Sequence, residues 1–297
     1  MPALLTCADG SAYAPSLYQY TAWAAARLAA SVEVLHVYPP AVPFYIPPVN
    51  FMGDPSMGSA SLALPELTAI SEAQEQEARS AALALLNDAA AALRTAGVHD
   101  VELTALAGTL PEVIADWEKP LDLLLLGKRG ESSSAQQKAL GSQLETVIRH
   151  SKQPVLVASH DFRPIRRFLI SFDDSPSAHA ALRHVVESPL LRGLPCDLVM
   201  AGDPTEENRA ALDSARAFLQ TGGFEAEEFL MQGDPETVSA WEIASNQIDL
   251  LVMGAYSHSR FLQFFIGSTT TEMIRRCRVP VLVMGGRMPP QHPGGAS

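Results

Sequence analysis

The sequence is poor in lysine, in cysteine and in long hydrophobic runs. Only four of its 297 residues are lysine, so the 21 basic residues are mainly arginine, and they face 33 acidic residues for a net charge of −12. No run of Lys and Arg interrupts this acidic chain. Such a chain binds polyanions poorly, so we expect neither nucleic acid nor a membrane as a partner. A mononucleotide stays open, because backbone amides hold phosphate without side-chain charge.

The cysteines and the apolar runs exclude further classes. Cys7, Cys196 and Cys277 are far apart and form no C-x-x-C motif. We therefore expect buried, unreactive thiols in a reducing compartment. Apolar runs such as residues 121–127 are far shorter than the roughly 20 residues of a membrane span. The N-terminal segment lacks the basic start and apolar run of a signal peptide, so we expect a cytoplasmic protein.

Two stretches, residues 121–159 and 248–285, repeat one pattern at the same spacing. Each has an Asp five residues before a Gly, then a Gly-Ser pair, an Arg eight residues past the Gly of that pair, and a Pro-Val-Leu-Val segment thirteen residues past it. This agreement indicates a duplication. The matching residues are Asp122/Asp249, Gly127/Gly254, Gly141/Gly267, Ser142/Ser268, Arg149/Arg275 and Pro154/Pro280.

The duplication extends upstream and divides the chain into two domains, in line with its length. Residues 4–11 parallel 168–175, and residues 33–40 parallel 197–204. The first copy carries an insert rich in proline and aromatic residues, which we expect to pack between the repeats rather than to act as a lid. The predicted boundaries are 1–160 for domain 1, with the insert at about 39–64, then 161–287 for domain 2 and 288–297 for a flexible tail.

Each half alternates short apolar segments with helical ones. Segments 121–127 and 248–254 are apolar on both faces, which is typical of buried parallel strands. Alternating strands and helices predict an α/β fold, a doubly wound parallel sheet with helices on both faces. The apolar terminal strands, 153–159 and 279–286, would be exposed sheet edges. We expect them to pair about a pseudo-two-fold axis as an intrachain pseudo-dimer, and association into a homodimer stays open.

Such a sheet binds ligands in the crevice at the carboxyl ends of its strands, where the winding reverses. The first strand ends at Asp9 and the fourth at Gly127; a loop then leads to Gly141-Ser142, which opens a helix. Free amides at a helix N-terminus suit phosphate, which would leave a base near Asp9. Turns also contain Gly and Ser for conformational reasons alone. The spacing is neither a phosphate loop nor G-x-G-x-x-G.

Together these motifs resemble a tandem pair of universal stress protein domains over about 285 residues. The pattern is G-x-x-G-x9-G-[ST], then a helix and a Pro-Val-Leu-Val strand. The first strand leads into Asp9-Gly10-Ser11, and the second ends in Leu35-His36-Val37. The resemblance implies a Rossmann-like fold, related to the adenine nucleotide alpha hydrolases, with five parallel strands per domain. It also implies adenine-nucleotide binding, which some members show.

Carried over residue by residue, the resemblance implies sites for ATP or another adenine nucleotide, with or without Mg²⁺. In domain 1, Asp9, Val37, Leu126 and Gly127 would contact adenine or ribose, and Gly130, Gly141, Ser142 and Gln143 the phosphates. The domain 2 positions are Asp173, Gly254, Ser257, Gly267, Ser268 and Thr269.

The sequence departs from the family pattern in both domains. The domain 1 loop before Gly141 is one residue longer than the motif. In domain 2, Ser257 replaces the second glycine and Asp174 adds a negative charge beside Asp173. We therefore expect domain 1 to hold the better site and the domain 2 site to be weak or empty. Residues 258–266 are rich in phenylalanine, which predicts a segment that covers the pocket or docks on domain 1 or another chain.

Three functions remain, in order of preference. The first is a stress-response regulatory protein that binds an adenine nucleotide, the second a nucleotide-free interaction scaffold, and the third a weak ATP hydrolase. A hydrolase needs a general base or metal carboxylates near the phosphates, whereas Asp9 is expected at the base end. We assign no catalytic residue and no metal ligand, since the histidines lack ligand spacing. Trp117 and Trp241 are expected in core packing.

Overall fold

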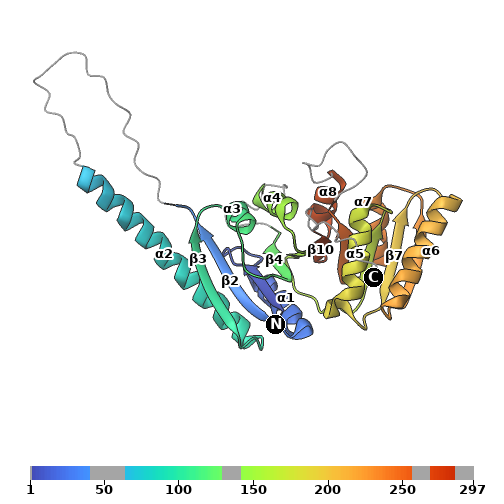
Figure 1. Cartoon of the computed structure of the whole chain (residues 1–297), viewed down its shortest axis with the longest axis horizontal. Helices are drawn as coiled ribbons and strands as arrows, with labels where there is room; N and C mark the ends of the chain where they lie inside the picture. Colours follow the sequence, from blue (N-terminus) through green and yellow to red (C-terminus); the bar gives the residue numbers. More distant parts are fainter. Residues whose placement is uncertain (1, 41–63, 129–141, 256–267, 285–297) are drawn as a thin grey trace, which may run out of the picture.

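A computed structural model describes residues 2–40, 64–128, 142–255 and 268–284, without the side chains of 64–71, 142, 268 and 269. The chain forms ten strands, eight α-helices and one 3-10 helix over these residues (Figure 1). Domain 1 comprises β1 (Ala3–Cys7), α1 (Ala14–Leu28), β2 (Ser31–Tyr38), α2 (Leu64–Thr95), β3 (Val101–Ala107), α3 (Leu110–Ala115), β4 (Leu123–Gly127), α4 (Ser142–His150) and β5 (Val155–Ala158). Domain 2 comprises β6 (Phe168–Phe172), α5 (Pro176–Glu187), η1 (Pro189–Leu191), β7 (Cys196–Ala201), α6 (Glu206–Thr221), β8 (Ala226–Met231), α7 (Pro235–Ser245), β9 (Leu250–Gly254), α8 (Ser268–Arg276) and β10 (Val281–Met284).

All ten strands belong to one sheet, in the order β3-β2-β1-β4-β5-β10-β9-β6-β7-β8. Within each domain every pairing is parallel. In domain 1 the chain moves outward from β1 to β2 and β3, then returns to the other side of β1 with β4. The doubly wound topology predicted from the sequence is confirmed, and the winding reverses between β1 and β4.

The terminal strands of the two domains pair with each other. β5 and β10 run antiparallel, with Leu156 opposite Leu282, and every residue of both strands is buried. The expected edge-to-edge pairing is therefore confirmed. Because each strand covers the open edge of the other domain's sheet, neither edge is left to pair with another chain.

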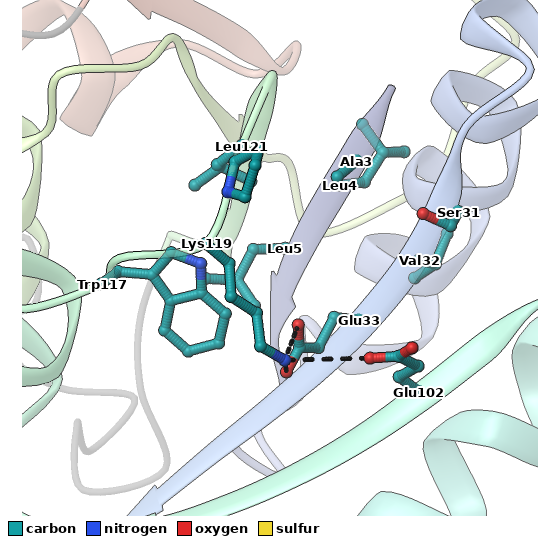
Figure 2. Close-up of a pocket in the computed structure, with 11 residues that line it drawn as sticks. Ala3, Leu4, Leu5, Ser31, Val32, Glu33, Glu102, Trp117, Lys119 and Leu121 are labelled. Atoms are coloured by element: carbon teal, nitrogen blue, oxygen red, sulfur yellow. Dashed lines mark hydrogen bonds and ion pairs between the residues drawn. The ribbon is translucent and has the colours of Figure 1, made fainter. Parts of the chain in front are cut away.

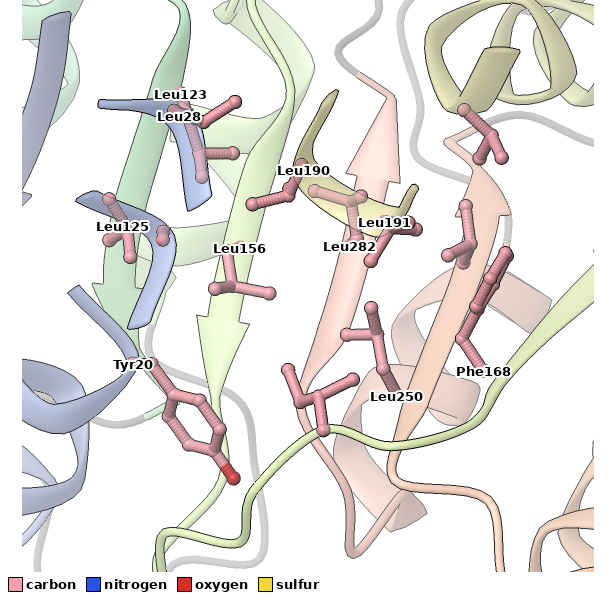
Figure 3. Close-up of a cluster of buried hydrophobic side chains, with 14 of the residues drawn as sticks. Tyr20, Leu28, Leu123, Leu125, Leu156, Phe168, Leu190, Leu191, Leu250 and Leu282 are labelled. Carbon is pink, nitrogen blue, oxygen red and sulfur yellow. The ribbon is translucent and has the colours of Figure 1, made fainter. Parts of the chain in front are cut away.

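Two hydrophobic cores cover the two faces of the sheet, and both run through both domains. Helices α1, α2, α5 and α6 pack on one face, and α3, α4, α7 and α8 on the other. Figure 3 shows the first core where the domains meet, with Leu156 on β5 and Leu282 on β10 near η1. The two domains therefore share buried apolar surface as well as backbone hydrogen bonds.

Polar contacts add to this union at the junction between the domains. The Tyr20 hydroxyl of α1 lies 3.0 Å from the Ser159 hydroxyl and accepts a hydrogen bond of 3.2 Å from the Arg163 amide. Arg27, also on α1, donates from its guanidinium to the carbonyl oxygens of Leu190 and Arg192 in domain 2. Helix α1 thus forms hydrogen bonds both with the segment that joins the two domains and with the region of η1.

The insert lengthens the helix that follows it. α2 has 32 residues, whereas α6, its domain 2 counterpart, has 16. Residues 41–63 of the insert lie outside the described residues, so its expected packing between the repeats stays a prediction. No helix in the described ranges is long and apolar enough to cross a membrane.

The cysteines and tryptophans follow the expectations in part. Cys7 and Cys196 are buried, and burial raises the pKa of both thiols; Cys277 is only half-buried, although burial also raises its pKa. Trp117 lies beyond the end of α3 and packs against the second core. The prediction is wrong for Trp241, which is 55% exposed on α7. Val238 and Glu242, one turn apart, face inward on that helix and leave Trp241 outside.

Candidate functional site

The carboxyl ends of β2, β1 and β4 meet at one edge of domain 1. Cys7, the last residue of β1, lies opposite Leu35 on one side and Leu126 on the other. Asp9 follows two residues later, just beyond the carboxyl end of β1, which lies between β2 and β4. The structure thus brings together Asp9, Val37, Leu126 and Gly127, the four residues that the sequence assigns to the base and ribose.

A network of short hydrogen bonds orients the turn that carries Asp9. The Asp9 carboxylate accepts a hydrogen bond of 3.0 Å from the Ser11 amide, and Gly10 between them has a φ of 66°. Such a left-handed residue favours glycine. The His36 ring, through Nδ1, lies 2.7 Å from the Ala8 carbonyl oxygen. Because a carbonyl only accepts, Nδ1 carries the proton and His36 fastens this turn to β2, a role that its sequence position did not reveal.

The Asp9 charge influences its neighbours. Burial, with the nearby charges of Asp9 and Asp88, raises the pKa of Tyr18 to about 12. Burial and the Asp9 charge also raise the pKa of Cys7. The Asp9 carboxylate therefore places a negative charge at the end of β1. A negative end suits hydrogen-bond donors such as an amino or hydroxyl group better than it suits phosphate.

The opposite side of the crevice begins where α4 begins. Helix α4 starts at Ser142 and leads into β5, which is parallel to β4, so its N-terminus lies at the carboxyl edge of the strands. The first amides of a helix have no partners within it and point toward this edge. Gln143 is exposed there. Gly130 and Gly141 lie outside the described residues, as do the details of the Ser142 side chain.

Domain 2 repeats the first turn with one change. The Asp173 carboxylate accepts a hydrogen bond of 3.1 Å from the Ser175 amide, as Asp9 does from Ser11. Asp174 has a φ of 57° where domain 1 has glycine, a conformation that strains a residue with a Cβ. Its carboxylate lies 2.8 Å from Nε2 of His179. The additional charge is therefore directed at a histidine of α5.

Gly254, at the end of β9, has a packing reason for being glycine. A Cβ at this position would lie 2.5 Å from the Ser177 hydroxyl oxygen and 2.6 Å from the Ser177 backbone carbon. The close approach of α5 to β9 therefore excludes any side chain here. Of the other domain 2 candidates, Ser268 and Thr269 begin α8. Ser257, Gly267 and the aromatic segment 258–266 lie outside the described residues.

The comparisons with known proteins agree with this architecture. The model of the universal stress protein family matches residues 2–159 and 197–285. The chain belongs to the universal stress protein family. The universal stress protein Slr1230 of Synechocystis is 32% identical over 95% of this chain and 99% of its own length. The alignment therefore runs through both domains of this chain and almost the whole length of that relative.

Solved structures show the same tandem fold at low identity. A universal stress protein of Archaeoglobus fulgidus aligns over 95% of this chain and 96% of its own, with a TM-score of 0.65 and 20% identity. A putative universal stress protein of Pseudomonas aeruginosa aligns over 96% and 93%, with a TM-score of 0.62 and 15% identity. At these identities the likeness shows the fold alone.

The opposite edge of each universal stress domain holds a cluster of charged residues. In domain 1 the Lys119 ammonium lies 2.7 Å from the Glu33 carboxylate, 3.8 Å from that of Glu102 and 5.5 Å from the centre of the Trp117 ring. These residues line a hollow of about 230 Å³, shown in Figure 2. The hollow lies at the amino ends of β1 and β2, away from Asp9. Its two carboxylates, those of Glu33 and Glu102, already form ion pairs with Lys119.

In domain 2 the equivalent cluster is more deeply buried. Asp197, opposite Glu227 in the sheet, is fully buried and accepts a hydrogen bond of 3.0 Å from Nε of Arg167. Glu242 of α7 is also fully buried and accepts a hydrogen bond from Asn246. Burial raises the pKa of Glu242, and the Asp197 charge adds to this, while the Asn246 hydrogen bond lowers it.

Glu242→Gln is therefore expected to change how stability depends on pH. A carboxyl whose pKa is raised by folding stabilises the fold below its unfolded pKa, near 4.5, and this contribution is lost as the pH rises through the folded pKa. We expect the variant to be more stable than the wild type at pH 8 and the advantage to shrink toward pH 4.5. Thermal unfolding across this range measures it, with Glu225→Gln as the exposed control. Parallel pH curves for Glu242→Gln and wild type would contradict the expectation.

Proposed function

We propose that this universal stress protein is a regulatory protein of the stress response that binds an adenine nucleotide, ATP or a relative, mainly in domain 1. The observation that carries the proposal is the position of Asp9 in the sheet. It lies at the reversal of the winding, between the carboxyl ends of β2 and β4. Ligands of doubly wound sheets bind at such a point.

The two sides of this crevice have complementary chemistry. The carboxylate of Asp9 can accept hydrogen bonds from an amino group of the base or from ribose hydroxyls, beside the apolar Val37 and Leu126. The N-terminus of α4 offers amides that have no partner within the helix, and the positive end of a helix dipole, to phosphate. A nucleotide lying from Asp9 to α4 would satisfy both sides. We place the base at Asp9 and the phosphates at Gly130, Gly141, Ser142 and Gln143.

We propose a weaker site, or none, in domain 2. Asp174 replaces the glycine of the first turn and brings an additional carboxylate to the edge. The glycine at 254 is required by Ser177 whether or not a ligand binds. A binding role is also favoured over hydrolysis, because Asp9 lies at the end assigned to the base. A general base must reach the attacking water near the phosphates.

Asp9→Ala is expected to weaken ATP binding at least tenfold, whereas Asp173→Ala has little effect. The reason is that a charge-assisted hydrogen bond contributes about 1.5–3 kcal/mol, and about 1.4 kcal/mol corresponds to a tenfold change. Isothermal titration of the wild type is expected to give one nucleotide per chain.

Gly141→Asp, directly before α4, tests the phosphate side of the site. This variant is also expected to weaken ATP binding at least tenfold, since a charge at a helix end contributes up to about 2 kcal/mol.

Several outcomes would contradict this proposal. Two equivalent nucleotides per chain, or equal losses in Asp9→Ala and Asp173→Ala, would remove the distinction between the domains. No binding by the wild type, and no nucleotide released by acid from the purified protein, would favour the scaffold function. The Asp9 carboxylate also accepts a hydrogen bond within the first turn. The unfolding temperatures of both aspartate variants must therefore match that of the wild type before their affinities are compared.

A further inference from the structure

Domain 2 contains a groove that does not belong to the nucleotide crevice. It lies between α7 and the C-terminal end of α8, close to the amino end of β9, and has a volume of about 930 Å³. Ile243, Ile248, Leu251, Met273 and Val279 contribute apolar side chains to its lining, beside polar and charged ones. The volume lies within the range of about 300–1,000 Å³ that is typical of small-molecule sites.

An exposed indole lines this groove, unlike the matching tryptophan of domain 1. Trp241 lines it from α7 and is 55% exposed, although large aromatic side chains are usually covered. The corresponding Trp117 packs against the second core and under Lys119. The difference arises because α7 continues through Trp241 to Ser245, whereas α3 ends at Ala115. Trp241 thus offers a ring face beside an apolar hollow.

Positive charge gathers around the groove in an otherwise acidic chain. Arg163, Arg276 and Arg278 line it, together with the two carboxylates of Glu236 and Asp249. Asp249 already accepts hydrogen bonds from the amides of Arg166 and Arg167. Three arginines against two carboxylates give the lining a formal net charge of +1, while that of the chain is −12.

Structural roles do not account for all three arginines. Arg276 forms an ion pair with Glu272. Among the described residues, no hydrogen-bond or ion-pair partner is present for the guanidinium groups of Arg163 and Arg278. Basic residues near a helix C-terminus often cap its carbonyls. Here Lys128 of domain 1 donates to the Cys277 carbonyl at 2.7 Å, so Arg278 is not needed for that purpose.

We propose that this groove binds a small amphipathic anion: a molecule with a planar aromatic ring that stacks on Trp241 and a carboxylate, sulfonate or phosphate that pairs with Arg163 and Arg278. Ring stacking and burial in the apolar lining would supply affinity. The two arginines would supply the selectivity for an anion, because a guanidinium fork matches such oxyanions. The site is separate from the proposed nucleotide crevice and does not depend on it.

A pair of fluorescent probes tests the proposal on the full chain. 8-Anilinonaphthalene-1-sulfonate and N-phenyl-1-naphthylamine have the same rings, and only the first carries a sulfonate. We expect the sulfonate probe to bind saturably at one site, with energy transfer from tryptophan. Trp241→Leu is expected to weaken it at least tenfold, and Arg163→Gln/Arg278→Gln at least fivefold. Arg209→Gln, exposed on α6, is the matched control. The neutral probe should respond to Trp241→Leu but not to the arginine variant.

The proposal is overturned if the Arg163→Gln/Arg278→Gln variant binds the sulfonate probe as tightly as the wild type does. It is equally overturned if this variant loses as much affinity for the neutral probe as for the sulfonate probe. It is also overturned if Trp241→Leu has no effect. Competition by ATP that disappears in Asp9→Ala would instead place the probe in the nucleotide crevice. Conversely, ATP binding unchanged in Trp241→Leu and probe binding unchanged in Asp9→Ala would show two independent sites. Circular dichroism and unfolding temperature confirm that each variant is folded.

Discussion

Residues 1–162 expressed alone are expected to form a homodimer or to aggregate, and not to give a stable monomer. Removing domain 2 uncovers the whole of β5, whose four residues are buried against β10 in the intact chain. It also opens both cores, which run through the two domains. Each buried Leu or Val contributes about 1.5–3 kcal/mol, and an uncovered apolar edge pairs with other chains.

Light scattering coupled to gel filtration measures the mass of this fragment. Mixing it with residues 163–297, also expressed alone, is the control: we expect a one-to-one complex, because the natural partner of β5 is β10. A monodisperse monomer of residues 1–162 that unfolds at the temperature of the intact chain would contradict the expectation.

Arg167→Met is expected to destabilise the protein by about 3 kcal/mol or more. The variant leaves the Asp197 carboxylate fully buried without its cation, and loss of one partner from a buried ion pair typically costs about 3–5 kcal/mol. Lys119→Met is the matched variant at the equivalent edge of domain 1. Lys119 is 57% exposed, so its loss is expected to cost less than about 1 kcal/mol.

Chemical denaturation of both variants measures the free energy of unfolding. Arg167→Met/Asp197→Leu removes both charges and is expected to recover most of the stability, since an apolar pair can replace a buried ion pair. Equal costs for the Arg167 and Lys119 variants, or no recovery in the double variant, would show that burial of Asp197 is not what makes Arg167 important.

Much of the architecture could be predicted because it follows from local and repeated sequence patterns. The matched spacings of Gly127 and Gly254 predict two copies of one fold. The apolar sequences of the terminal strands predict that they must be covered, and the β5–β10 pairing confirms it. The Asp-Gly-Ser sequence at Asp9 predicts a turn after a strand, because glycine favours the left-handed φ of 66° found at Gly10. Topology rules then place Asp9 beside Gly127.

Other features depend on contacts between distant segments, which no local pattern contains. Trp241 resembles Trp117 in sequence, but the length and rotation of α7 decide that it is exposed. Gly254 matches a ligand motif, yet Ser177 of α5 also requires it. The pairing of Arg167 with Asp197 joins residues thirty positions apart. The sequence alone thus determined the fold, the duplication and the edge that holds the candidate site. Only the tertiary structure decided which side chains are buried, paired or left open to a ligand, because those outcomes depend on how helices pack across the sheet.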